Sequence, residues 1–256
     1  MPSSTRSIIV LCGLLVLTTL PAYAQDATST ITKAQSTLDS IASLIDGINA
    51  RHSNVPGAAA ESADPESLFD GKSLAGWKKT DFRGSGEVAV ERSFRGGPGA
   101  IVVSPGSALT GITYLKDVPK TNYEISLECM KIEGLDFMLG LTFPVGDSHA
   151  SLILGGWGGN VVGISSLDGH DASENETSRG MTFVTDHWYK VRMRVTPKKL
   201  EAWLDDKKIV DQEIANRKVS LRFGEISKSV PLGLATYQTK AAYRAIRLHK
   251  FEAESQ

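Results

Sequence analysis

The feature of this sequence that most constrains its fold is an alternation of apolar and polar residues throughout residues 67–253. In residues 188–195 one face of the alternating pattern is apolar and the other is basic. A period of two residues is that of a β-strand with one buried face. Residues 200–204 and 209–211 repeat the pattern on either side of a polar turn, as a hairpin does. Similar runs predict strands at 100–104, 109–115, 122–132, 135–143, 148–156, 159–166, 181–184, 219–223, 231–237 and 243–251.

No helical stripe interrupts these runs, and Gly, Pro and Asp residues separate them. Many short strands joined by such turns are typical of an all-β sandwich or barrel. The sequence mixes strands that are apolar on both faces with strands that are polar on one face, which favours a sandwich. We therefore predict a single β-sandwich domain over residues 67–253, which is long enough to bury one core.

Residues 1–24 contain the three parts of an export signal. Arg6 supplies a positive charge, residues 8–20 are apolar, and residues 22–24 (Ala-Tyr-Ala) form a small-x-small cleavage site. A bacterial signal peptide of this kind is removed on export, so we expect the mature protein in the periplasm or outside the cell. The apolar run is too short to span a bilayer, and no later segment is long or apolar enough.

Residues 25–66, between the signal and the sandwich, predict a short helix followed by a linker. Apolar residues recur there at alternating three- and four-residue steps, which places them on one face of a helix. They are Ile31, Ala34, Leu38, Ile41, Ile45 and Ile48. This 31–48 stripe is short for a coiled coil and leaves three alternatives: self-association with a second copy, docking on the sandwich, or neither. Residues 53–64, with Pro, Gly and several Ala residues, predict a flexible linker.

The charge balance and the cysteine count exclude several classes of function. The chain has 28 basic and 29 acidic residues, and Arg6 leaves with the signal, so the mature net charge is about −2. This balance gives neither the basic surface that binds nucleic acid nor a polybasic membrane patch. Cys129 is the one cysteine beyond residue 24, which rules out an intrachain disulfide. Its apolar neighbours indicate a small buried hydrophobe and not a nucleophile.

Four segments of the sequence resemble strand motifs of one known family. They are LFDGKSLAGW (68–77), DHWYKVRMRV (186–195), LEAWLDDKKIVD (200–211) and VPLGLATYQTKAAYRAIRL (230–248). The segments are similar to the 3-keto-disaccharide hydrolase domain family, which implies a concanavalin A-like jelly roll. The family's Asn-Ser-Gly-Ile strand is replaced here by GLDFMLGLTFPVG at residues 134–146. Because that strand borders the family's expected substrate face, the replacement bears on activity more than on fold.

The resemblance implies cleavage of a sugar that carries a ketone at C3. The ketone makes the hydrogen at C2 acidic, a base removes it, and the enolate expels the glycosidic oxygen from C1. Addition of water to the resulting alkene completes a net hydrolysis. The protein must supply a base, a group that stabilises the enolate, and an acid for the leaving oxygen.

Strand alternation indicates which polar groups are placed for this chemistry. Within residues 135–143 the core side is assigned to Phe137 and to every second residue after it. The same rule, applied to three consecutive runs, leaves Glu128, Asp136 and His149 on the outward side. If these strands are antiparallel neighbours, the three side chains converge, and we predict them as the catalytic residues. The alternative is that they are outward polar residues in contact with solvent, as most such residues are.

Several further residues are predicted to contact the saccharide. Two share the outward face of the same strands, one is a tryptophan in a glycine-rich turn on which a sugar ring can stack, and the others lie in later loops. They are Thr142, Ser151, Trp157, His170, Asp171, Arg179 and Gln238. Residues 168–179 form a polar loop that fits a lid, a divalent-cation site or an ordinary surface loop. Because its spacing matches neither a zinc motif nor an EF-hand, we predict no metal and no other cofactor, and keep the divalent cation as an alternative.

Two functions fit these observations, and both have a saccharide as the partner. The first is an exported hydrolase that cleaves glycosidic bonds of 3-keto-disaccharides or related saccharides. The second is a non-catalytic glycan-binding or adhesion module on the same fold. The replaced strand at 134–146 favours binding, whereas the set of Glu128, Asp136 and His149 favours catalysis.

Overall fold

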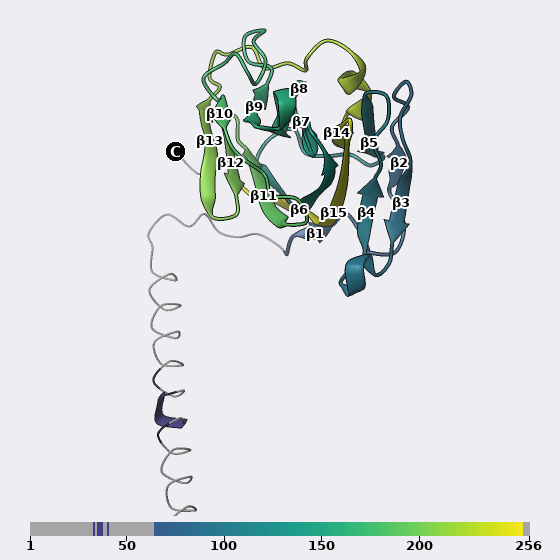
Figure 1. Cartoon of the computed structure of the whole chain (residues 1–256). Helices are drawn as coiled ribbons and strands as arrows, with labels where there is room; N and C mark the ends of the chain where they lie inside the picture. The colour runs from purple at the N-terminus through teal and green to yellow at the C-terminus, as the bar shows by residue number, and fades with distance from the viewer. Residues whose placement is uncertain (1–32, 34, 38–39, 41–63, 253–256) are drawn as a thin grey trace, which may run out of the picture. The chain divides into compact units, whose positions relative to one another are not determined.

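Two antiparallel sheets account for the strands of the computed structural model, which describes residues 33, 35–37, 40 and 64–252 (Figure 1). The eight-stranded sheet contains, in spatial order, β13 (Lys207–Glu213), β12 (Lys199–Leu204), β11 (Trp188–Val195), β6 (Tyr123–Gly134), β15 (Thr239–Lys250), β4 (Ala100–Val103) and β3 (Val88–Glu91), with β1 (Glu66–Ser67) beside β15. The seven-stranded sheet contains β10 (Arg179–Gly180), β9 (Val161–Ser165), β8 (Ser148–Gly155), β7 (Leu139–Val145), β14 (Gly233–Tyr237), β5 (Leu109–Tyr114) and β2 (Trp77–Lys79). Short helical turns are η1 (Phe94–Gly96), α2 (Gly156–Gly159) and η2 (Glu225–Ser229). The prediction of an all-β sandwich is confirmed.

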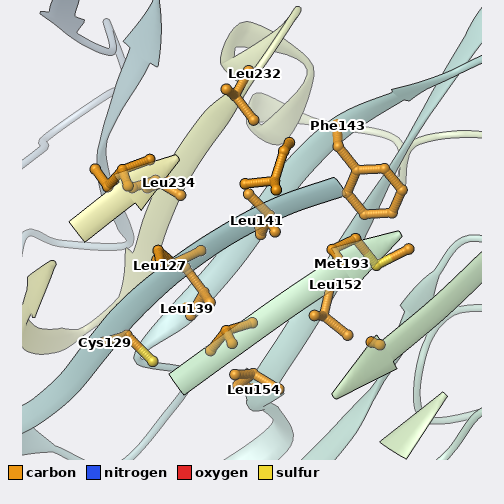
Figure 2. Close-up of a cluster of buried hydrophobic side chains, with 14 of the residues drawn as sticks. Leu127, Cys129, Leu139, Leu141, Phe143, Leu152, Leu154, Met193, Leu232 and Leu234 are labelled. Atoms are coloured by element: carbon orange, nitrogen blue, oxygen red, sulfur yellow. The ribbon is translucent and has the colours of Figure 1, made fainter. Parts of the chain in front are cut away.

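The core lies between the two sheets and is built from the apolar faces of the alternating strands (Figure 2). Figure 2 shows side chains from both sheets meeting there, among them Leu127, Cys129, Leu139, Leu141, Phe143, Leu152, Leu154, Met193, Leu232 and Leu234. Cys129 is fully buried, and burial raises the pKa of its thiol. The thiol is therefore a structural hydrophobe, as its position in the sequence indicated.

Most predicted strands form, but the runs at 181–184 and 219–223 do not. Both are extended segments without a neighbouring strand to complete a ladder. Met181 N donates only to Asn160 O at 2.8 Å, and Val219 makes a single bridge to Leu167. Strands β1, β3 and β10 were not predicted, because each is too short or too charged for the alternation to stand out.

The alternation also breaks just before β7. Phe137 was assigned to the core, but it lies on the outer face of the seven-stranded sheet, where its ring covers Gly140. The next residue, Met138, is fully buried in the core together with Leu139. The chain bends between these residues before the strand begins, so Phe137 leaves the core face while the other residues assigned to it, Leu139, Leu141 and Phe143, are in the core as predicted.

Two buried tyrosines connect the sheets by hydrogen bonds across the core. The hydroxyl of Tyr123, on β6, donates to Pro144 O of β7 at 2.5 Å. The hydroxyl of Tyr243, on β15, lies 2.6 Å from Met138 O and 3.3 Å from Ala235 O of β14. Burial raises the pKa of both phenols, so both remain protonated donors.

The first part of the chain is described at only a few positions. Within the predicted 31–48 helix, the described residues 33, 35–37 and 40 are helical and exposed, and Thr37 Oγ1 donates to Lys33 O at 2.9 Å. Residues 1–24, with the predicted signal, and most of the predicted 53–64 linker lie outside the described residues. The chain divides into two units, Met1–Ala58 and Ala59–Gln256. Among the helices that are described, none is long and apolar enough to cross a membrane.

We expect Tyr243→Phe to lower the free energy of unfolding by about 1–3 kcal/mol, because it removes a fully buried donor from Met138 O and Ala235 O. Urea unfolding followed by tryptophan fluorescence measures the change. Tyr237→Phe is the matched control, since this tyrosine is 36% exposed, and we expect a change within about 0.5 kcal/mol. Equal losses in the two variants would contradict a role for the inter-sheet hydrogen bond.

Candidate functional site

The three predicted catalytic residues do not converge. Glu128 is on β6, which pairs with β11 and β15 in the eight-stranded sheet and not with β7. Its carboxylate lies on the outer face of that sheet, 2.6 Å from Arg244 Nε. His149 lies on β8 of the other sheet. The prediction of three adjacent strands is wrong, because the chain crosses between the sheets after β6.

Asp136 lies in this crossing and is held by backbone groups. Its Oδ1 accepts from Phe137 N at 2.7 Å, and its Oδ2 accepts from Gly158 N at 3.1 Å. The second bond joins the crossing to the α2 turn that carries Trp157. The structure therefore brings Asp136 beside Trp157, as predicted for a shared site, but without Glu128.

His149 is half-buried on the outward face of β8, opposite Pro144 of β7. Burial lowers the pKa of its imidazole, and the nearby positive charge of Lys120 lowers it further. The side chain is thus neutral at pH 7 and able to accept a proton. Within the described residues, no carboxylate forms an ion pair with it.

The outer face of the seven-stranded sheet carries a row of small and hydroxyl side chains across neighbouring strands. The register places Thr113, Gly233, Thr142, Ser151 and Ser165 side by side in this row. Thr142 Oγ1 lies 3.0 Å from Ser151 Oγ, and Ser165 Oγ donates to Asp171 Oδ1 at 3.0 Å. Three predicted substrate-binding residues, Thr142, Ser151 and Asp171, are therefore brought together.

A segment of residues 218–229, the covering segment, crosses this row. At one end Ser220 exchanges backbone hydrogen bonds with Ser166, beside β9. At the other end Thr113 Oγ1 donates to Lys228 O, over β5. Leu221 and Ile226 pack between these points against the outer face of the sheet. Thr142 and Ser151 lie on this face but are buried, 0% and 3% exposed. Their hydroxyls hydrogen-bond to each other and are closed to solvent.

The predicted polar loop at 168–179 is held by its own side chains. Asn175 Nδ2 donates to the carbonyls of Ile164, His170 and Asp171 at 2.8–3.0 Å. Arg217 pairs with both Asp168 and Glu176 at 2.5 Å, and Arg222 Nη1 lies 3.2 Å from Asp171 Oδ2. Arginines therefore pair with three of the four loop carboxylates that were considered for a divalent cation. In the described part of the chain, no cluster of three or more His, Cys, Asp or Glu residues is placed to hold a metal.

Side chains that contact the α2 turn, together with exposed aromatic residues next to Phe137 and Arg222, form what we call the Trp157 surface. Its members are Leu135, Asp136, Trp157, Arg222, Phe223 and Tyr237. Trp157 is 40% exposed and has left-handed backbone angles, φ 49° and ψ 55°. The Arg222 guanidinium lies 5.7 Å from the centroid of its ring. Phe223 is fully exposed, and the ring of Tyr237 lies 6.0 Å from that of Phe137.

The remaining predicted substrate-binding residues are placed differently. Gln238 Nε2 donates to Ser107 O at 3.0 Å, so its amide closes a turn beside β5. His170 and Arg179 are exposed, and neither is joined to the Trp157 surface by a hydrogen bond or ion pair within residues 64–252. Arg222, Phe223 and Tyr237 were not predicted. An aromatic residue directly before a glycine, Phe223-Gly224, is the sequence signal that could have indicated the second of these residues.

Comparison with known proteins agrees with the resemblance seen in the sequence. Residues 64–249 match the family described as the 3-keto-alpha-glucoside-1,2-lyase-like domain. This match supports a carbohydrate-active or carbohydrate-binding role. No protein of curated function matches the sequence.

Many solved structures are similar to the sandwich, and the three described here share 10–15% sequence identity with it. The Crh5 transglycosylase in complex with NAG is 10% identical with a TM-score of 0.50, over 78% of this chain and 88% of that one. The carbohydrate-binding module CBM66 from Bacillus subtilis is 10% identical with a TM-score of 0.45, over 68% and 96%. Domain 4 of AbnA, an extracellular arabinanase from Geobacillus stearothermophilus in complex with arabinotriose, is 15% identical with a TM-score of 0.45, over 68% and 82%. At 10% identity, the likeness to the transglycosylase shows the fold alone.

We expect Arg217→Met to lower the melting temperature at pH 7 and to have little effect near pH 2. The Lys218 N–H and Arg217 lower the pKa of Asp168, and Arg217 lowers that of Glu176. Carboxyls with lowered pKa values stabilise the fold above their unfolded pKa of about 4, and this stabilisation is lost as the pH falls through the folded values. Melting curves from pH 7 to pH 2 test the prediction. Arg247→Met, an exposed arginine without an ion pair to any described residue, is the control and should show no such pH dependence.

Proposed function

Because the chain belongs to the 3-keto-alpha-glucoside-1,2-lyase-like family, we propose that it binds a saccharide on the Trp157 surface. The observation that carries the proposal is the conformation of Trp157 itself. A large side chain in left-handed backbone geometry costs about 1–2 kcal/mol. The tryptophan held there keeps 40% of its surface exposed, so its ring remains open to contact with a ligand. Strain of this kind concentrates where a side chain is presented to a ligand.

The neighbours of Trp157 suit a sugar. An exposed indole face stacks on the apolar face of a pyranose or furanose ring, and hydroxyls at the ring edge need polar partners. Arg222 supplies guanidinium donors on one side, and Asp136 supplies a carboxylate fixed by Gly158 N. Tyr237 and Phe223 add exposed aromatic side chains beside Phe137 and Arg222.

Binding is favoured over cleavage by the placement of the acids and the imidazole. Cleavage of a glycosidic bond needs an acid and a base on one substrate. Glu128 lies on the opposite sheet and is paired with Arg244, while the carboxylate oxygens of Asp136 accept from backbone N–H groups. We also propose that the protein acts outside the cytoplasm, on the basis of the export signal in residues 1–24.

Trp157→Ala is expected to weaken saccharide binding about tenfold or more, because truncation of a central aromatic contact removes more than about 1 kcal/mol. A glycan array identifies a bound oligosaccharide, and titration calorimetry with that oligosaccharide compares the variants. Trp203→Ala is the matched control, since Trp203 lies on the eight-stranded sheet, packed by Arg192 and Lys208. Equal affinity of the Trp157 variant and the wild type for the oligosaccharide would refute binding at this surface.

A second candidate function is cleavage of a 3-keto-glycoside, and His149 is the observation that favours it. Its neutral imidazole lies on the same face of β8 as Ser151, and proton abstraction next to a ketone requires such a base. A base works in its deprotonated form. Because burial and Lys120 lower the pKa of His149 below its usual 6.5, the rate should have reached its maximum by neutral pH.

If the chain cleaves 3-keto-disaccharides, the rate should rise with pH below about 6.5 and level off above it. His149→Gln should abolish turnover, whereas Glu128→Gln, on the other sheet, should leave it unchanged. Release of the free sugars from a 3-keto-disaccharide between pH 4 and 8 is the measurement. Turnover by the His149 variant at the wild-type rate would exclude this residue as the base.

A further inference from the structure

We propose that the Trp157 surface contains a subsite for an anionic group on the saccharide, formed by Lys131. The inference rests on the proposed saccharide binding and adds the class of sugar. Lys131 is on β6 and lies only 8% exposed, which is unusual for a lysine. Its neighbour two positions earlier, Cys129, points into the core, so the lysine stem starts from the inner face of the sheet.

The ammonium of Lys131 reaches the α2 turn. Its Nζ lies 3.6 Å from the point that a Cβ on Gly159 would occupy. Gly159 is two residues after Trp157 and has no side chain to cover this point. Nζ makes no hydrogen bond to the described residues and is not completely enclosed, so a small part of the ammonium surface contacts solvent. The lysine thus has a buried stem and an open end at the edge of the Trp157 surface.

The charge of Lys131 is not compensated by the chain. Across residues 64–252, Nζ makes neither an ion pair nor a hydrogen bond. By contrast, Arg244, which is also largely buried, is paired with Glu128 at 2.6 Å. Asp136 is the acid in the adjoining crossing, and its two oxygens accept from Phe137 N and Gly158 N instead. A fixed cation without an internal partner is suited to an external anion.

The arrangement selects the chemistry of the ligand. Packing has already ordered the lysine stem, so binding an anion does not require the loss of its rotamer freedom. Arg222 places a second cation over the Trp157 ring, and Asp171 neutralises only part of its donor set. A sugar stacked on Trp157 that carries a carboxylate or a sulfate offers an anion to both the Lys131 ammonium and the Arg222 guanidinium. The subsite therefore favours acidic saccharides over neutral ones.

The test compares three probes by titration calorimetry with the full chain. They are a short oligogalacturonate, its methyl-esterified neutral form, and a sulfated carrageenan oligosaccharide. We expect the wild type to prefer an anionic probe to the neutral one, and the stronger anionic probe identifies carboxylate or sulfate as the group. Lys131→Met should weaken that probe about tenfold, the effect of one charge-assisted hydrogen bond, and leave the neutral probe unchanged. Lys131→Arg should retain most of the preference, because it keeps the charge.

The control is Lys190→Met, which removes an exposed lysine from β11 on the other sheet. Melting temperatures show whether each variant is folded, and if Lys131→Met is not, Lys131→Gln takes its place. Equal wild-type affinity for the anionic and neutral probes, or an unchanged preference in the Lys131 variant, would overturn the subsite while saccharide binding stands. If the wild type binds none of the probes and no glycan on the array, both proposals fall.

Discussion

The rest of the structure depends on the hydrogen bonds that cross the core from Tyr123 and Tyr243. Each phenol spans from the eight-stranded sheet to a carbonyl of the other sheet or of the crossing that leads to it. Tyr243 in particular holds Met138 O, at the end of the crossing between β6 and β7. Asp136 lies in the same crossing and bonds to the α2 turn. The position of Trp157 is therefore linked, through one carboxylate, to a donor in the centre of the core.

Two features that are locally unfavourable occur at the same place. Trp157 has a backbone conformation that favours glycine, and Lys131 directs an uncompensated charge at the turn beside it. Elsewhere in the described residues, cations such as Arg217 and Arg244 have carboxylate partners. Natural sequences depart from local consistency mainly at functional positions. The coincidence of the two departures, more than either alone, argues that this end of the sandwich is the binding region.

Alternation assigned the buried side of β6, β8 and β11 correctly, because a strand with one apolar face has one way to lie on a core. It does not state which sheet a strand joins, and that is why Glu128 and His149 were placed together. The crossing after β6 also bends at Phe137, where the two-residue alternation of a strand assigns the wrong face. Arg222 lies in a segment with one strand-like bridge, so its contact with Trp157 depends on tertiary packing that no local pattern records.

The outer face of the seven-stranded sheet carries mostly short side chains at its centre, since Gly140, Gly163, Gly233 and Ala235 lie among the threonines and serines of the row described above. A sheet face of this kind can be covered by a ligand or by another segment of the same chain. Here the chain itself covers the face: Phe137 packs on Gly140 and Ser229 packs on Gly233. Leu221 and Ile226 of the covering segment pack on the same face. The same segment carries Arg222 and Phe223 out to Trp157. The covering segment thus both closes the outer face of this sheet and carries Arg222 to Trp157, which is why we propose ligand contact at the edge of the sheet.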